Sequence, residues 1–173
     1  MTPTAPTLPT TETSRLADQL ERSFRGGAWQ GPSIAEALAG VTAARAHQRP
    51  LPGAHDILEL VFHIAFWLDG ARRRIAGEAM AGLAPLAPDA DWAVARGGEI
   101  DPEAAWRAAL ARLEEAHRSL HATVLELDDE RLDQPVAGSD PTLRGMLLGV
   151  LQHNAYHAGQ IALLAKADGA SAS

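Results

Sequence analysis

Apolar residues recur along most of this chain with the alternating spacings of three and four that place them on one side of a helix. In the segment from 102 to 127 they form a single stripe of Trp106, Leu110, Leu113, His117, Leu120, Val124 and Leu127. Similar stripes follow 56–77 and 141–167, and each such stripe is the face that an amphipathic helix buries. We therefore expect long helices at 14–25, 56–77, 102–127 and 141–167, with short helical turns between 33 and 48.

The expected helices begin at residues that cap helices well. Two segments start with the spacing of a capping box, in which a Ser or Asp precedes a Glu by three positions, and two start with an Asp followed by a Pro. These starts are Ser33, Asp56, Asp101 and Asp140. Runs of β-branched residues and hairpin turns are missing, so the sequence predicts an all-α fold built as a four-helix bundle.

The segment 77–99 between the second and third long helices is interrupted by proline and glycine, and it exceeds most helix connections in length. A helix of about 20 residues is ~30 Å long, so this linker can return along the bundle and start the third helix parallel to the second. We expect it to be a crossover or a lid.

One domain accounts for a chain of 173 residues. The first 13 residues hold three prolines and six threonines and no apolar run, which predicts a disordered lead rather than a signal peptide. We expect the bundle domain at 14–168 and a flexible tail at 169–173.

The net charge of −7 has the wrong sign for binding a phosphate backbone, so nucleic acid is not an expected partner. The basic run 72–74 is typical of a solvated helix face. The longest apolar stretch, 58–68, is too short to span a membrane, and the cytoplasm is the expected compartment. Because the chain contains no Cys, histidines and carboxylates would have to bind any metal ion.

Two pairs of histidines have the spacing that brings both rings to one side of a helix. His153 and His157 lie ~6 Å apart along the helix axis, so both can reach one ion. His117 and His121 have the same spacing, but His117 lies in an apolar stripe and His121 beside it in a polar sequence. We expect the second pair to be one packed and one solvated histidine.

His63 lies in the middle of the apolar second helix, where an imidazole needs a buried partner. It is the natural third ligand for an ion bound by His153 and His157, although a lone histidine there can also be a hydrogen-bonded core residue. His55 is two turns, or ~12 Å, from His63 and too far to share its ion.

Two longer stretches carry a family resemblance. Residues 52–67 read PGAHDILELVFHIAFW and residues 144–161 read RGMLLGVLQHNAYHAGQI. Over roughly 16–166 the chain resembles the DinB-like family, which includes the YfiT-type metalloenzymes. The resemblance implies an up-down-down-up bundle with the linker as crossover, a nickel or zinc ion on His63, His153 and His157, and a homodimer. It also implies a transferase that uses a low-molecular-weight thiol.

Three neutral imidazoles leave at least one coordination position open, which is typical of a catalytic metal site. Taken with the resemblance, this open position predicts a metal-dependent enzyme in which a thiol attacks a small electrophile. Glu59 and Tyr156 are candidate catalytic residues, and Gln152, Gln160 and Trp67 are candidate substrate-binding residues. Each has an ordinary structural interpretation as well, in capping for Glu59 and in packing or surface exposure for the others.

Two alternatives remain open at this point. One is a metal-dependent hydrolase that uses bound hydroxide, although Asn154 stands where the metallopeptidase motif has Glu. The other is a bundle that binds a metal or another ligand without catalysis.

Overall fold

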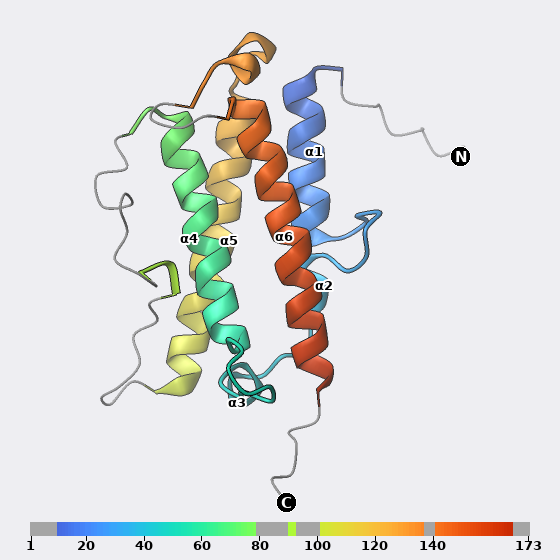
Figure 1. Ribbon diagram of the computed structural model, residues 1–173, viewed down its shortest axis with the longest axis vertical. Helices are drawn as coiled ribbons and strands as arrows, with labels where there is room; N and C mark the ends of the chain where they lie inside the picture. The colour runs from blue at the N-terminus through green and yellow to red at the C-terminus, as the bar shows by residue number, and fades with distance from the viewer. Residues whose placement is uncertain (1–9, 79–89, 93–100, 137–140, 168–173) are drawn as a thin grey trace, which may run out of the picture.

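The computed structural model describes residues 10–78, 90–92, 101–136 and 141–167, and within these ranges the secondary structure is helical throughout, with no strand (Figure 1). The α-helices are α1 (Glu12–Arg25), α2 (Ile34–Leu38), α3 (Ala43–Ala46), α4 (Ile57–Ile75), α5 (Pro102–Leu125) and α6 (Leu143–Lys166). Two short 3-10 helices, η1 (Ala90–Trp92) and η2 (Asp129–Asp133), lie in the connections. The predicted all-α fold is confirmed.

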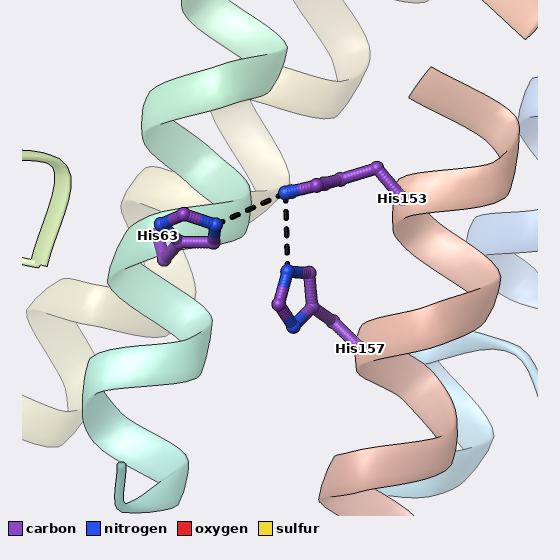
Figure 2. Close-up of side chains that lie close together, drawn as sticks. All are labelled: His63, His153 and His157. Carbon is purple, nitrogen blue, oxygen red and sulfur yellow. Dashed lines mark hydrogen bonds between the residues drawn. The ribbon is translucent and has the colours of Figure 1, made fainter. Parts of the chain in front are cut away.

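The four long helices lie side by side and share one apolar core (Figure 1). α4 packs against α5 and α6, and α1 packs against the same two helices. Side chains from the predicted stripes, such as Ile64, Leu120 and Ile161, are almost completely buried between them. α4 and α6 face each other in the region enlarged in Figure 2, where histidine side chains from the two helices point toward one another.

The ends of α4 are defined by local hydrogen bonds. Asp56 caps its N-terminus by accepting a bond from the Glu59 backbone N–H, and the Glu59 side chain accepts one from the Asp56 N–H in return. At the other end Gly77 has a φ of 69°, in the left-handed region that glycine adopts without strain. The N–H groups of Gly77 and Glu78 donate back to carbonyls of the last turn, which is a Schellman motif. The predicted capping box at Ser33 and the aspartate cap at Asp101 are likewise confirmed.

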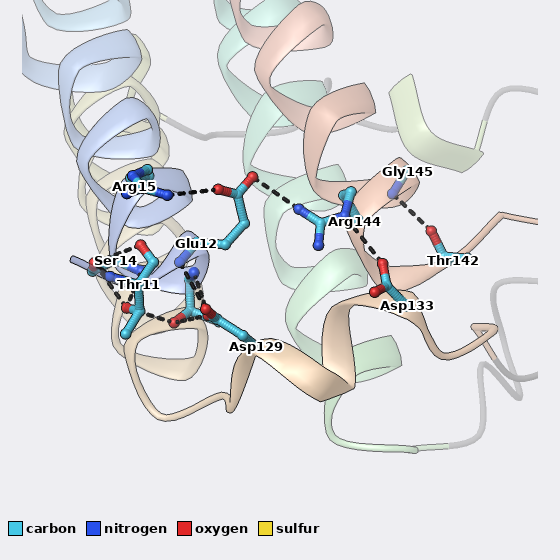
Figure 3. A network of polar contacts seen from close by, with 10 residues as sticks. Thr11, Glu12, Ser14, Arg15, Asp129, Asp133, Thr142, Arg144 and Gly145 are labelled. Carbon is cyan, nitrogen blue, oxygen red and sulfur yellow. Dashed lines mark hydrogen bonds and ion pairs between the residues drawn. The ribbon is translucent and has the colours of Figure 1, made fainter. Parts of the chain in front are cut away.

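The start of α6 differs from the expectation at Asp140 and Pro141, because the helix is capped by Thr142 instead. The Thr142 hydroxyl accepts a hydrogen bond from the Gly145 N–H at 3.2 Å (Figure 3). Pro141 is used differently: its carbonyl accepts from the Val136 N–H in a short antiparallel bridge formed by Pro135 and Thr142. Extended backbone in this bridge delays the helix by two residues. Asp140 lies outside the described residues.

α1 begins at Glu12, two residues before the predicted start, and distant contacts stabilise the extra residues. The Asp129 carboxylate of η2 accepts hydrogen bonds from the backbone N–H groups of Glu12 and Thr13 (Figure 3). These bonds lower the pKa of Asp129. Arg144 of α6 pairs with Glu12 at 2.8 Å and with Asp133 at 3.2 Å, so one end of the bundle is bound together by charge.

Parts of the predicted domain boundaries fall on residues 1–9 and 168–173, outside the described residues. The described part of α6 ends at Lys166, with Ala167 as its cap. No helix in the described ranges combines the length and the apolar character needed to cross a membrane.

Candidate metal centre

Three histidines from two helices meet between α4 and α6. His63 projects from the middle of α4, and His153 and His157 project from successive turns of α6 (Figure 2). The Nε2 atom of His153 lies 3.0 Å from that of His63 and 3.1 Å from that of His157. The structure thus brings together the three residues that the sequence singles out as candidate ligands.

The arrangement of the ring nitrogens suits a metal ion. One donor nitrogen from each histidine lies within 4.8 Å of the other two. In a tetrahedral site with metal–nitrogen bonds of about 2.0–2.1 Å, donor atoms are about 3.3 Å apart, close to the separations found here. The cluster could therefore bind a divalent ion after only small shifts of the rings.

Gln160 holds the His157 ring in the orientation that metal binding requires. The Nδ1–H of His157 donates to the Gln160 side-chain oxygen at 2.6 Å, which leaves the Nε2 lone pair facing the other two histidines. The Gln160 amide nitrogen in turn donates to the Tyr156 hydroxyl at 3.1 Å. Gln160, a predicted substrate-binding candidate, and Tyr156, a predicted catalytic candidate, thus form a series of hydrogen bonds that orients His157.

Asp91 of η1 lies on the far side of the His63 ring. Its Oδ2 is 3.3 Å from His63 Nδ1 and accepts a hydrogen bond from the Trp67 indole N–H at 3.2 Å. The contact with His63 is not aligned as a hydrogen bond, and Nδ1 has no other partner among the described residues. A carboxylate in this position can orient a metal-binding imidazole through the ring nitrogen that does not face the ion.

The Trp92 indole covers one face of the His63 ring. Its ring stacks on His63 with the ring centres 3.7 Å apart and on His55 with the ring centres 3.6 Å apart. His55 is separated from His63 by this indole and is not part of the three-nitrogen cluster, as expected from its spacing. The linker between α4 and α5 therefore contributes both a carboxylate and an aromatic cover to the centre.

The three histidines are held neutral by burial. Burial and the neighbouring His157 lower the pKa of His63 to about 4, and burial with both neighbouring histidines lowers the pKa of His153 to about 3. Burial also lowers the pKa of His157. Because only a neutral imidazole binds a metal, the cluster has the correct protonation state at neutral pH.

A cavity of about 400 Å³ opens beside the cluster. His63, His153 and Asp91 line one part of it, and apolar side chains including Met146 and Val150 line much of the rest. Gly149 also lines it, and a Cβ atom added there would meet no atom within 4 Å. The glycine therefore leaves space next to the cluster.

A family model described as the DinB superfamily matches residues 29–161, which include the three histidines. The chain belongs to the DinB superfamily. A crystal structure of a conserved protein from Enterococcus faecalis is similar in fold, with a TM-score of 0.64 and 16% sequence identity. The similarity covers 91% of this chain and 97% of that one. No curated protein matches this sequence.

Other histidines and acids of this DinB-superfamily chain have structural partners. His117 is buried, stacks on Phe24 and contacts a Glu21 carboxylate oxygen at 2.9 Å, which agrees with the expected packed role. His121 is half-buried rather than solvated, because its ring lies 6.0 Å from that of His117. Glu59 caps α4 and contacts Arg49 and His55, away from the three ring nitrogens.

Of the remaining candidates, Trp67 lines the cavity, whereas Gln152 is exposed on α6 and Tyr156 is 64% exposed. Sequence reasoning about this DinB-superfamily chain missed Asp91 and Arg74, both of which line the cavity. Asp91 stands two residues after Asp89 in a segment without helical periodicity, and it carried no signal. Arg74 is the last of three consecutive arginines. Its helical spacing from His63 could have indicated that it lies on the same face of the helix.

Changing Asp91 to Ala is expected to weaken zinc binding by roughly 10- to 100-fold, because removal of a carboxylate that orients a metal-binding histidine has effects of this size. Competition with a chromophoric chelator measures the affinity. Asp69→Ala removes a carboxylate from α4, the helix of His63, that pairs with Arg72 and Arg73 at the surface, and it should leave the affinity unchanged. Equal affinities for wild type and Asp91→Ala would assign Asp91 to packing alone.

Proposed function

We propose that this chain is a metal-dependent transferase in which a low-molecular-weight thiol attacks a small electrophile at the cluster of His63, His153 and His157. The observation that carries the proposal is the convergence of three neutral ring nitrogens beside a cavity of about 400 Å³, two of them from histidines that line it. A site with three histidine ligands keeps a coordination position open. Here that position would face the cavity, where a small molecule can reach it.

A nickel or zinc ion bound there would lower the pKa of a thiol beside it and so supply a thiolate at neutral pH. The chain has no cysteine of its own, so the thiol must be a separate molecule. Trp67, Met146 and Val150 supply apolar walls that exclude water from it. Gln160 holds the His157 ring in place, Asp91 lies 3.3 Å from the His63 Nδ1, and Tyr156 acts on the cluster only through Gln160.

The proposal is tested by adding a thiol to cobalt-loaded protein. We expect 2-mercaptoethanol to change the visible cobalt spectrum and to produce a sulfur-to-cobalt band in the near ultraviolet. The same protein should accelerate displacement of chloride from 1-chloro-2,4-dinitrobenzene by the thiol, and His63→Ala should not. A cobalt spectrum that stays unchanged at saturating thiol would overturn the transferase proposal.

The open position would accept water as readily as a thiol, so a hydrolase with bound hydroxide is the alternative. The two functions differ in their need for a thiol. Hydrolysis of 4-nitrophenyl acetate by the zinc-loaded protein without any thiol, lost in His63→Ala, would favour the hydrolase. Metal binding with neither activity would leave a binding protein.

We also propose that the bundle has the up-down-down-up order; most of the linker 77–99, the predicted crossover or lid, lies outside the described residues. The colour gradient in Figure 1 supports this order, because residue numbers rise toward the top in α4 and α5 and toward the bottom in α1 and α6. The position of η1 beside α4 supports a linker that returns along the bundle. A cytoplasmic location fits the proposed use of a reduced thiol.

We propose that the chain forms a homodimer through α6. No Asp, Glu, Lys or Arg occurs from 145 to 165, although Leu148, Tyr156 and Leu163 are 45%, 64% and 62% exposed. Light scattering should give a mass of twice 18.3 kDa, and the double variant Leu148→Glu, Leu163→Glu should reduce it to the single-chain mass. Leu125→Glu, at an exposed leucine that ends α5, is the matched control. A monomeric wild type would contradict the proposal.

A further inference from the structure

One face of α4 connects the histidine cluster to a positive charge. His63, Trp67, Ala71 and Arg74 follow one another along this face at spacings of four, four and three residues, and all four line the cavity. Across from them lie Met146, Gly149, Val150 and His153 of α6. The cavity therefore has histidines in one part of its wall, apolar side chains along its length and an arginine in another part.

The arginine lies within reach of a small molecule that also touches the cluster. The guanidinium carbon of Arg74 is 5.8 Å from the Trp67 ring centre, which is 6.2 Å from the His63 ring centre. The charge thus lies no more than roughly 12 Å from His63, by the sum of these two separations. A chain of five or six carbons spans about 5–6 Å at ~1.25 Å per bond, which is about half of that upper limit.

Arg74 differs from the two arginines that precede it. Arg72 pairs with Asp69 and Glu78, and Arg73 pairs with Asp69, so both are neutralised at the surface. In the part of the chain that the structure describes, no carboxylate forms an ion pair with Arg74, which is half-buried. Asp91 is the carboxylate in the cavity wall, and it contacts His63 and Trp67 instead.

We propose that the cavity binds a small carboxylate, with the carboxylate on the Arg74 guanidinium and the opposite end of the molecule at the histidine cluster. The planar guanidinium fits a carboxylate through two parallel hydrogen bonds. One cation in a largely apolar cavity matches a single negative charge. A phosphate dianion would need further donors, and the backbone N–H groups in the middle of α4 and α6 are used within the helices.

This inference deepens the proposed function and rests on it for the role of the bound molecule. The carboxylate can belong to the thiol or to the electrophile, because both must enter the same cavity. The chemistry that Arg74 recognises is the same in either case. Two binding measurements separate these sources, and the first of them needs neither metal nor thiol.

In the first measurement, metal-free protein is titrated with hexanoate and with 1-hexanol while the NMR signal of the Trp67 indole N–H is followed. Hexanoate should bind at least about 10-fold more tightly, which is the usual effect of one charge-assisted hydrogen bond or more. Arg74→Met should abolish the difference, and Arg74→Lys should retain part of it. Arg73→Met, which removes a neighbouring charge that faces Asp69, should behave as wild type.

In the second measurement, cobalt-loaded protein is titrated with 6-mercaptohexanoate and with 6-mercapto-1-hexanol, and the cobalt spectrum reports thiol binding. A preference for the carboxylate of about 10-fold that Arg74→Met removes would assign the carboxylate to the thiol. Equal binding of the two thiols, with hexanoate still preferred over hexanol, would assign it to the electrophile.

Failure of the two proposals gives different results. If hexanoate and hexanol bind equally to wild type, or if Arg74→Met keeps the preference, the carboxylate site is wrong whatever the thiols do. If neither thiol changes the cobalt spectrum but hexanoate is preferred and Arg74→Met removes the preference, the carboxylate site holds and the transferase proposal fails.

Discussion

His153→Ala is expected to reduce the metal content of the purified protein from about one ion per chain to less than about a tenth of that. The Nε2 atom of His153 is the central donor, 3.0 Å from one of the other two ring nitrogens and 3.1 Å from the second. Without it, one nitrogen on each of two helices remains, and the affinity that comes from three preorganised donors is lost. Elemental analysis of protein purified without a histidine tag or chelator measures the content.

His121→Ala is the matched control for this change. It removes a half-buried histidine that also stands four residues from another histidine on a helix, and it should leave the metal content unchanged. Far-ultraviolet circular dichroism of both variants verifies that the bundle is folded. Metal lost from His121→Ala and kept by His153→Ala would move the metal site to α5.

Zinc or nickel is expected to raise the melting temperature by roughly 8–16 °C when the free metal is about 1,000 times its dissociation constant. Metal that binds only the folded state stabilises it by about 4.1 kcal/mol at that excess. Each kcal/mol raises the melting temperature of a chain of this size by roughly 2–4 °C. The unfolded chain gains little, because His63 and His153 are 90 residues apart in sequence.

Thermal unfolding followed by circular dichroism, with and without added metal, measures this shift. Addition of a chelator should reverse it, and His153→Ala should show almost none of it. A shift of equal size in the variant would mean that the metal binds elsewhere, and an unchanged wild-type melting temperature would mean that the cluster does not bind the ion.

Most of the fold can be predicted from local sequence, because helix faces and caps depend on residues three or four apart. Asp56 with Glu59 and Ser33 with Glu36 form the capping boxes that their spacing predicts. The start of α1 was displaced by a contact between residues distant in sequence, and the start of α6 by the bridge between Pro135 and Thr142. The Asp129 carboxylate extends α1 from 116 and 117 positions away, and no local pattern predicts such a contact.

Local sequence likewise predicts some residues of the candidate site and misses others. His153 and His157 could be paired from their spacing on one helix, and His63 could be added because a polar ring in an apolar stripe needs a partner. Asp91 reaches His63 from an irregular segment, and neither periodicity nor capping places such a residue. Arg74 lies in the row of α4 residues that faces the cavity, and Arg73 does not. The sequence does not show which row of α4 faces the cavity, so it could not separate the two arginines.

The distribution of the three histidines over α4 and α6 also determines when the centre can exist during synthesis. His63 leaves the ribosome 90 residues before His153. At about 5–20 residues per second this interval is roughly 5–18 s, during which the early helices hold only one of the three ring nitrogens. A metal ion that binds all three histidines therefore cannot guide the packing of α1, α4 and α5 while α6 is still being synthesised.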